Sequence, residues 1–460
     1  MKNSIIYISA LISLVLFGSC NKQLSLKPTD VILSEDALKN MDDLKAAMFG
    51  VYAANTAALN KIYIASILAD ETNVGGGNRG QGLPTFKWQY TSEEDVHNAD
   101  FATYYSMING INEILLVIDA IPTNSSTDVS NKKRIKAELT ALRGIAHYEV
   151  LTRFMSAGYD PNGLGVPIML QPSLTAQPAR ATVGDVITQV KTDLTVGRNE
   201  STIPNAPDDI TRLSQATIAA YQARIGLLTR NWADAITYAK QAKLLSGAPL
   251  ATGNDFFDYW ADINEMESLW NYHNTYAQGY WYDTNGDVFF NPSNKLVNDY
   301  DQNNDIRFYA FCVNAAGTAL SISKYPGSSE GPQINDLKLV RSAELYLNLA
   351  EAYAHQNNLD SAQAYLDTLR AARINGYSSV PFTGQADAIS QVIDERFKEF
   401  CFEGYRFFDL KRNSLPIQRE SDDVQSPNWQ TMPANSYLFA MPIPQHEMFS
   451  NKNMVQNPNY

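Results

Sequence analysis

The chain has 460 residues, of which 45% are hydrophobic and 18% charged, and its formal net charge at pH 7 is −13. This length allows a large hydrophobic core, in one composite domain or in two. The acidic charge argues against nucleic acid and anionic lipid head groups as partners, because both would be repelled.

The N-terminus predicts a lipoprotein export signal. Lys2 gives a positive start, residues 5–17 form an apolar run, and Leu16-Phe17-Gly18-Ser19-Cys20 is typical of a lipoprotein acylation box. The run is too short to cross a bilayer, since a membrane helix needs about 20 residues. We expect residues 1–19 to be removed as a signal peptide. The alternative is an ordinary secretory peptide with an incidental cysteine.

If Cys20 carries lipid, residues 20–30 form a tether and the rest of the chain lies outside the bilayer. No later stretch is long and apolar enough to span a membrane, so the lipid is the only membrane attachment that the sequence predicts. The lipid anchor indicates a surface-exposed protein.

Residues 31–246 predict a helical scaffold. Apolar residues recur at spacings of three and four from Leu38 to Tyr52, and further helices are expected at 100–121, 132–156 and 183–199. Residues 70–98 interrupt the pattern with Gly75-Gly76-Gly77, which cannot hold a helix. A loop of this length in a compact domain is usually functional or disordered.

Two helix pairs share one pattern of small residues. Ala223 and Ala235 lie twelve positions apart within residues 214–245, and Ala350 and Ala362 repeat this offset within residues 341–373. Small residues there allow two antiparallel helices to approach closely. The pattern resembles the tetratricopeptide unit, whose period is about 34 residues. The alternative is a pair of unrelated alanine-rich helical hairpins.

Residues 247–335 separate the two pairs and differ from them. The segment is weak in helical periodicity, and twelve aromatic residues lie between Phe256 and Phe290. We expect an insertion of loops and short strands on the helical scaffold, followed by residues 336–460 with the second helix pair and the C-terminal region.

The aromatic residues of this insertion are the strongest indication of a ligand. Aromatic faces cover the C–H patches of sugars, and Trp and Tyr also offer hydrogen bonds at their edges. Polar neighbours surround part of the cluster, whereas Phe256, Phe257, Trp260 and Trp270 have apolar or helix-like neighbours and predict packing. The candidate ligand-binding residues are Tyr276, Tyr280, Trp281 and Tyr282, together with Arg79, Trp88 and Tyr90 from the 70–98 loop. Core packing is the alternative for the rings, and a solvated surface position is the alternative for Arg79.

Catalysis and metal binding have weaker support. Glu395, Glu399 and Glu403 stand four apart on one helix stripe beside basic residues, which favours a salt-bridged structural helix over a carboxylate pair that flanks a substrate. Cysteine and histidine spacing indicates no metal site, and Cys312 and Cys401 are expected as small core residues. Segments 283–287 and 299–305 each match part of a calcium loop, with plain turns as the alternative. We therefore expect no enzymatic activity and no cofactor beyond a possible structural calcium.

Three blocks of sequence resemble the starch-utilisation D (SusD)/RagB family of outer-membrane nutrient-binding lipoproteins. They are Glu395 to Arg412, the helix around Glu138 to Phe154 followed by Gly165-Val166-Pro167, and the end from Met441-Pro442-Ile443-Pro444 to Tyr460. The start from Cys20 to Pro28 fits as well. Gly144 and Asn459 depart from the family pattern, and residues 156–164 are an extra stretch.

The resemblance implies a mainly α-helical fold, a tetratricopeptide-like scaffold with an inserted, irregular, aromatic-rich ligand-binding subdomain. It also implies a TonB-dependent outer-membrane transporter as partner, and structural calcium in some members. The leading hypothesis is a lipid-anchored protein on the outer membrane, facing the cell surface, that delivers oligosaccharide to the transporter. The alternatives are capture of peptides or other nutrients by the same architecture, and a ligand-free tetratricopeptide scaffold for protein interaction, which the aromatic insertion disfavours.

Overall fold

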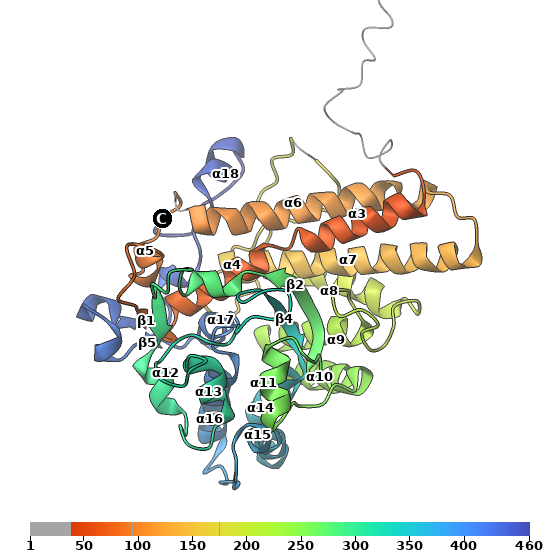
Figure 1. The fold of residues 1–460 in the computed structure, drawn as a ribbon. Helices are drawn as coiled ribbons and strands as arrows, with labels where there is room; N and C mark the ends of the chain where they lie inside the picture. The colour runs from red at the N-terminus through yellow and green to blue at the C-terminus, as the bar shows by residue number, and fades with distance from the viewer. Residues whose placement is uncertain (1–37, 94, 174) are drawn as a thin grey trace, which may run out of the picture.

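The computed structural model describes residues 38–93, 95–173 and 175–460, and shows a mainly α-helical protein (Figure 1). Cys20 and the rest of the proposed signal and tether lie outside the described residues. Within the described ranges, every helix is too short or too polar to cross a membrane.

The N-terminal half is built from long helices that pack side by side. Helices α3, α6 and α7 contact one another, and α8 returns along α7 (Figure 1). The bounds are α3 (Met41–Ala53), α4 (Ala57–Leu68), α6 (Asp95–Val117), η1 (Ile118–Ala120), α7 (Ser126–Phe154) and α8 (Val183–Asn199). The helix predicted at 183–199 agrees with α8, and those predicted at 100–121 and 132–156 begin about one turn or more too late.

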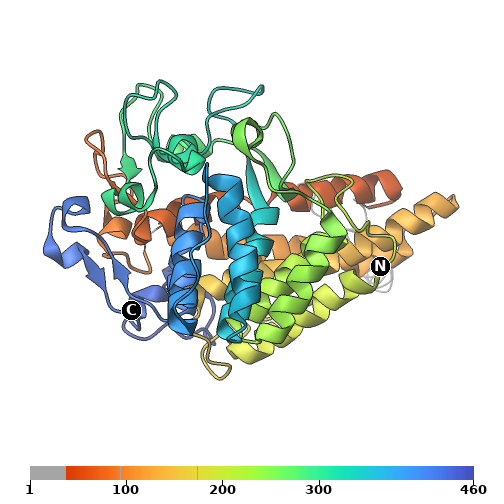
Figure 2. The same ribbon diagram turned by 90° about the horizontal axis from the view of Figure 1, so that it is seen from below.

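The row of helices continues through two hairpins to the C-terminal region. Helix α10 packs on α14, and α14 packs on α16, so the helices lie in order across the molecule (Figure 2). The bounds are α9 (Gln215–Leu228), α10 (Trp232–Ser246), α14 (Ser342–His355), α15 (Leu359–Arg373), α16 (Gln385–Phe400) and α17 (Arg406–Arg412).

Both hairpins use the same turn. Arg230 and Asn357 each adopt a φ of 57°, and the following residues, Asn231 and Asn358, cap the next helix with their side chains. The capping oxygen accepts a hydrogen bond from a backbone N–H that would otherwise lack a partner. The four alanines at the twelve-residue offset are fully buried. The tetratricopeptide-like prediction is therefore confirmed in turn geometry and in packing.

The segment between the hairpins lies on one side of the helix row (Figure 2). It contains the strands that were expected, but also three short α-helices that were not. Its elements are α11 (Gly253–Trp260), β2 (Ser268–Thr275), η2 (Ala277–Tyr280), β3 (Phe290–Pro292), α12 (Asn294–Asp299), α13 (Ile306–Cys312) and, at its end, β4 (Asn335–Arg341). The weak periodicity concealed these helices because each is only about two turns long.

Short antiparallel strand pairs tie distant segments together. β1 (Thr72–Val74) pairs with β3, β2 pairs with β4, and β5 (Ile417–Gln418) pairs with β6 (Thr431–Met432). The predicted 70–98 loop thus contains a strand and one helical turn, α5 (Leu83–Phe86). The remaining C-terminal elements are η3 (Ser421–Asp423), η4 (Pro427–Trp429), η5 (Tyr437–Phe439) and α18 (Gln445–Ser450).

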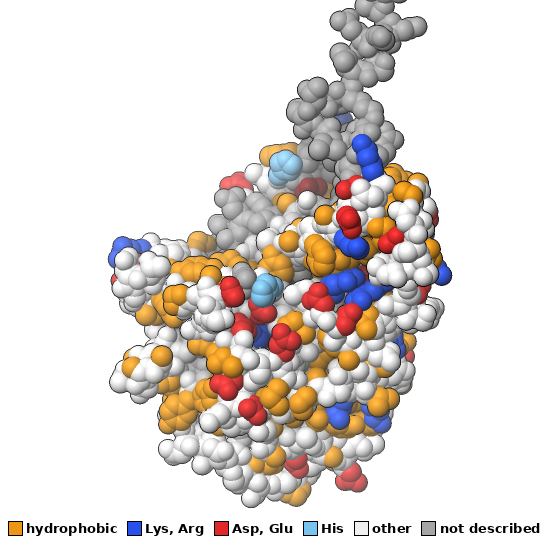
Figure 3. Space-filling model, turned by 45° about the vertical axis from the view of Figure 1, so that its right-hand side comes forward, with side chains coloured by type: hydrophobic (Ala, Val, Ile, Leu, Met, Phe, Trp, Pro, Cys, Tyr) orange, Lys and Arg blue, Asp and Glu red, His pale blue; other side chains and the backbone are white. Residues whose placement is uncertain are grey.

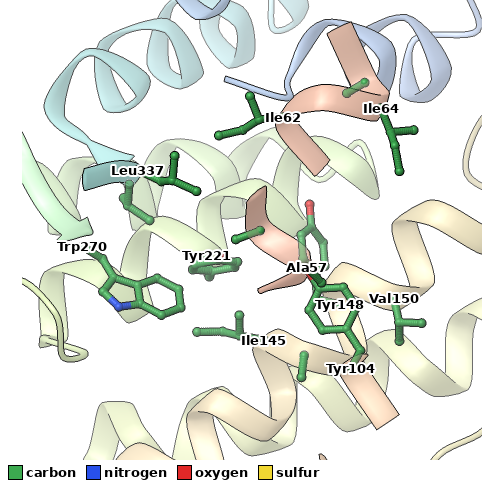
Figure 4. Packing of buried hydrophobic residues seen from close by; sticks show 14 of the residues in the cluster. Ala57, Ile62, Ile64, Tyr104, Ile145, Tyr148, Val150, Tyr221, Trp270 and Leu337 are labelled. Atoms are coloured by element: carbon green, nitrogen blue, oxygen red, sulfur yellow. The ribbon is translucent and has the colours of Figure 1, made fainter. Parts of the chain in front are cut away.

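A shared aromatic core fixes the inserted segment on the scaffold. Trp270 of β2 meets Tyr221 edge-on, with ring centroids 6.0 Å apart (Figure 4). It also meets Tyr52 edge-on, at 6.5 Å. Its indole N–H donates to the carbonyl oxygen of Thr211 at 3.2 Å. Because Tyr221 belongs to α9 and Tyr52 to α3, this one ring links the insertion to both parts of the scaffold.

A buried ionic cluster provides the second link. Glu399 on α16 accepts ion pairs from Arg307, Arg341 and Arg373 at 3.0, 2.7 and 3.0 Å, and all four side chains are fully buried. Burial alone would raise the pKa of Glu399, but the arginines hold it well below its usual range. The prediction that the glutamate stripe is structural is confirmed, since Glu395 and Glu403 pair with arginines of the same cluster.

The two cysteines described by the structure are buried and unpaired, which confirms that they are small core residues. The helix containing Glu395 is interrupted after Phe400, where Phe402 and Gly404 adopt φ values of 61° and 80°. This break carries Glu403 back toward β4, so the charge network depends on it.

Candidate functional site

The glycine run of the 70–98 loop lies against the hairpin of residues 281–290. The N–H groups of Gly75 and Gly77 donate to the carbonyl oxygens of Phe289 and Val288, both at 2.9 Å. A Cβ on Gly75 would lie 2.3 Å from the Val288 carbonyl oxygen. Glycine is required here because two backbones approach closely, and not because the loop must move freely.

Arg79 lies at the tip of this loop and remains accessible. Its side chain is 76% exposed, and its guanidinium forms an ion pair with Asp287 on the hairpin. This ion pair links the loop to the hairpin, and the Asp287 carboxylate balances the charge of the arginine.

Three predicted ligand-binding aromatics are buried, so the prediction that they are accessible rings is wrong. Trp281 is 0% exposed and packs against Tyr63 and Phe402, with ring centroids 5.9 Å away in each case. Trp88 is buried, and its indole N–H donates to the Leu68 carbonyl oxygen at 2.9 Å.

Tyr90, the third, is also buried and donates to the Leu438 carbonyl oxygen. Because successive side chains in a strand point to opposite faces, the pairing of Tyr282 with Val288 directs Tyr282 outward and Trp281 inward. Applying the two-residue period of a strand to this hairpin would have predicted opposite orientations for Trp281 and Tyr282.

The other predicted tyrosines differ in exposure and direction. Tyr276 is 46% exposed and donates to Gln333 Oε1 at 2.5 Å. Tyr280 stacks on Tyr63 at 4.5 Å and donates to Asn60 on α4, so it faces the scaffold. Of the predicted rings, Tyr282 is the one that lines a groove.

This groove has a volume of about 480 Å³ and lies between α11, the hairpin, α13 and the loop after α13. Its size is in the range typical of small-molecule sites, about 300–1,000 Å³. Three accessible rings line it: Phe257 is 39% exposed, Tyr309 is 50% exposed, and Tyr282 is half-buried. Neutral polar side chains complete the wall, namely Gln278, Asn314, Ser321 and Ser323.

Sequence reasoning missed two of these rings. Phe257 was assigned to packing, but the buried residues of α11 are Phe256, Tyr259 and Trp260, which leaves Phe257 on the open side. Tyr309 is the exposed position of α13, whose other residues are all buried. The helical periodicity of α13 contained this signal, although its two turns are too short to recognise with certainty from sequence.

Two residues of the groove wall contain buried polar atoms that have no hydrogen-bond partner within the described residues. Gln278 uses its amide NH₂ to donate to the Tyr282 hydroxyl and to the Ile322 carbonyl oxygen, and its Oε1 is unpaired. The indole N–H of Trp260, at the groove wall, is unpaired as well. Gln278 and Trp260 are each only 1% exposed, so these two atoms lie behind the groove surface, and the accessible polar groups of the wall are those of its partly exposed side chains.

The segments compared with calcium loops are engaged in turns and caps. Asp283 Oδ1 accepts from the N–H groups of Asn285 and Asp287, both at 2.9 Å, and Asp305 caps α13 and pairs with Arg307. Across the described ranges, His, Cys, Asp and Glu side chains form no group of three or more that could hold a metal ion. The turn interpretation is the one that these contacts fit.

Acidic and basic side chains lie scattered among neutral polar ones on the face seen in Figure 3, and hydrophobic side chains gather there in small groups. Several further rings are exposed outside the groove, including Tyr437 and Phe449 near the C-terminus. These rings offer comparison positions for the groove aromatics.

Solved structures with the same fold cover nearly the whole chain. A SusD superfamily protein from Bacteroides thetaiotaomicron is 24% identical, with a TM-score of 0.80 over 91% of this chain and 100% of that one. A SusD-like carbohydrate binding protein from Bacteroides vulgatus is 20% identical, with a TM-score of 0.77 over 91% and 98%. A laminarin binding SusD-like protein is 19% identical, with a TM-score of 0.70 over 92% and 100%.

A comparison with curated proteins found no match. Two family models match the sequence itself. Residues 266–460 match the SusD family, and residues 22–227 match the SusD-like family described as starch-binding associating with outer membrane. The first match includes most of the inserted segment and the whole C-terminal region, and the second covers the N-terminal scaffold. Both agree with the shared fold, so the chain belongs to the SusD/RagB family, a family of binding proteins and not of enzymes.

Proposed function

We propose that this protein is a lipid-anchored, cell-surface glycan-binding protein that captures oligosaccharide in the groove between α11, the 281–290 hairpin and α13. The observation that carries the proposal is the set of three accessible rings, Phe257, Tyr282 and Tyr309, around a cavity of about 480 Å³. Rings of this kind cover the apolar faces of sugars while neutral polar groups receive the hydroxyls.

The family supports the same ligand class. One matching family model is described as starch-binding, and two similar structures are named for carbohydrate and laminarin binding. Arg79 and Tyr276 lie near the groove elements, because Arg79 pairs with the hairpin and Tyr276 directly precedes η2. We assign them to the outer part of the site, for longer ligands.

The proposal includes delivery of the glycan to a TonB-dependent outer-membrane transporter. The outer-membrane association in the family description and the acylation box before Cys20 support this location. The helical-repeat side offers an extended surface of the kind that repeat proteins use for binding partners. Recovery of a β-barrel partner from mildly solubilised membranes would support delivery, whereas recovery of the protein alone in several mild detergents would contradict it.

The ligand site is tested with substitutions at the groove. Tyr309→Ala and Phe257→Ala should each weaken binding of laminarin or starch oligosaccharides by about 1–3 kcal/mol, the free energy of losing a stacked ring. This equals a factor of about five to more than one hundred in Kd, measured by calorimetry. Tyr437→Ala is the matched control, because this tyrosine is 43% exposed and lies outside the groove.

Melting curves for all three variants should stay close to the wild-type curve, since each ring is exposed. The wild type must bind the glycan for the test to apply. If Tyr309→Ala and Phe257→Ala then bind it as tightly as the control variant, the groove is not the glycan site. The anchor is tested by Cys20→Ala, which should release the protein from the membrane fraction. If the variant stays membrane-bound, lipid anchoring at Cys20 is wrong.

A further inference from the structure

The charge of the groove points to one class of glycan. We propose that the site selects neutral glycans over uronic-acid or sulfated ones, and that Asp258 is the residue that imposes this selection. This inference rests on the proposed function, because it specifies the ligand of the same groove.

Asp258 is the one charged side chain among the described residues that line the groove. It lies on α11 between Phe257 and the buried pair Tyr259 and Trp260, and it is partly exposed. Within the part of the chain that the structure describes, its carboxylate forms no ion pair and no side-chain hydrogen bond. A bound anion would therefore meet an uncompensated negative charge.

The buried cations around Trp260 do not offset this charge. Three of them lie against the ring of Trp260: Lys324 at 4.6 Å, Lys338 at 5.8 Å and Arg341 at 5.5 Å. All three are buried, and each is already paired with a carboxylate, Lys324 with Glu403, Lys338 with Asp262, and Arg341 with Glu399. They hold the ring in place, and none lines the groove.

Hydrogen-bond chemistry favours the same choice. The Asp258 carboxylate, which is partly exposed at the groove, only accepts hydrogen bonds, so it needs a donor from the ligand. A sugar hydroxyl can supply this donor. A carboxylate or sulfate has no proton to donate, so it would leave the Asp258 carboxylate unpaired and would also repel it.

The test compares neutral glucans with their sulfated forms on the same backbone. The full chain in detergent is titrated with laminarin, soluble starch and the sulfated derivative of each, at low ionic strength, because salt screens the repulsion. The sulfated glucan should bind at least about tenfold more weakly, which is about 1.4 kcal/mol. Asp258→Asn should reduce the ratio of the two Kd values, sulfated over neutral, to about threefold or less. Added salt should reduce the same ratio in the wild type.

The net charge of −13 also repels polyanions from a distance, so a control must separate the two effects. Asp360→Asn on α15 removes one exposed carboxylate outside the groove and should leave the ratio unchanged. If both variants change the ratio equally, the local role of Asp258 is refuted. Sulfated glucan that binds as tightly as the neutral form would overturn the inference and leave glycan binding intact. Failure of every neutral and sulfated glucan to bind would instead count against the proposed function.

Discussion

Glu71 offers a direct test of how the scaffold and the C-terminal region fit together. This carboxyl group is fully buried next to Asp70, at the start of β1. Its Oε2 accepts from the Phe402 N–H at 3.2 Å, while Oε1 has no partner within the described residues. Burial therefore raises the pKa of Glu71 to about 7.

Asp70, the neighbouring carboxylate, has a lowered pKa instead. Burial alone would raise the pKa of Asp70, but the guanidinium of Arg406, at 2.8 Å, and the ammonium of Lys295, at 2.7 Å, hold it well below its usual range. Asp70 is thus charged in the folded protein, and Glu71 keeps its proton up to neutral pH because no cation pairs with it.

The rise in the pKa of Glu71 determines how the free energy of unfolding changes with pH, in sign and in size. Below pH 4.5 the carboxyl is protonated in both states and contributes no pH dependence. Between pH 4.5 and about 7 the unfolded state ionises first, so the folded state binds more protons and stability falls as pH rises. The full loss is about 3 kcal/mol, at about 1.4 kcal/mol for each pH unit between the two pKa values.

Glu71→Gln removes this titration and keeps an acceptor for the Phe402 N–H. Thermal unfolding of wild type and variant should be compared from pH 5 to pH 8. The variant should gain about 3 kcal/mol on the wild type over this range. For a chain of this length that is about 3 °C in Tm, because the unfolding entropy scales with the number of residues.

Wild type and Glu71→Gln share all other titratable groups, so the pH dependence of those groups cancels in the difference between the two Tm values. Asp70→Asn is the control, and it should lower Tm at both pH values because it leaves Arg406 and Lys295 without their carboxylate. A difference in Tm between Glu71→Gln and wild type that stays constant from pH 5 to pH 8 would refute the reasoning.

Three other substitutions, two of them with a matched control variant, test the packing. Trp281→Ala should lower the free energy of unfolding by about 3–5 kcal/mol, because the ring is fully buried. A melting curve measures this loss, and an unchanged Tm would show that the ring is not part of the core. Glu399→Gln should cost about 3–5 kcal/mol, because three buried arginines lose a shared carboxylate. Asp119→Asn, in an exposed pair with Lys136, should cost less than about 1 kcal/mol, and equal costs in urea unfolding would contradict the buried cluster. Gly226→Ala should cost about 1–3 kcal/mol, because its Cβ would lie 2.5 Å from the Ala235 backbone nitrogen, whereas Gly50→Ala, with nothing within 4 Å, should be neutral or stabilising in the same assay.

Local sequence determined the helices and their pairing. The 3.6-residue periodicity of residues 183–199 is sufficient to place α8, because one face of that helix is apolar over several turns. The alanine offsets identified both hairpins, because close helix approach requires small side chains at defined positions. The glutamate stripe at 395–403 was correctly assigned to structure, because it lies on one helix beside basic residues.

The exposure of the aromatic rings was decided by the tertiary structure. Trp281 and Tyr282 are adjacent and have similar polar neighbours, yet Trp281 is buried under Tyr63 and Phe402 while Tyr282 lines the groove. Tyr280 reaches Asn60, which lies 220 positions away in the chain. Neighbouring residues carry no information about such contacts, so composition could indicate that some aromatic rings are accessible but could not select which ones.

The groove itself depends on the same long-range packing. Phe257, Tyr282 and Tyr309 come from a helix, a hairpin and a second helix, and only the docking of these elements brings them around one cavity. The glycine run shows the same limit, because its composition predicts a flexible loop, while its role is to let one backbone approach another. The sequence thus identifies the long scaffold helices and the family that the chain resembles. The short helices of the insertion escaped it, and the burial of each side chain follows from contacts between segments that are far apart in the chain.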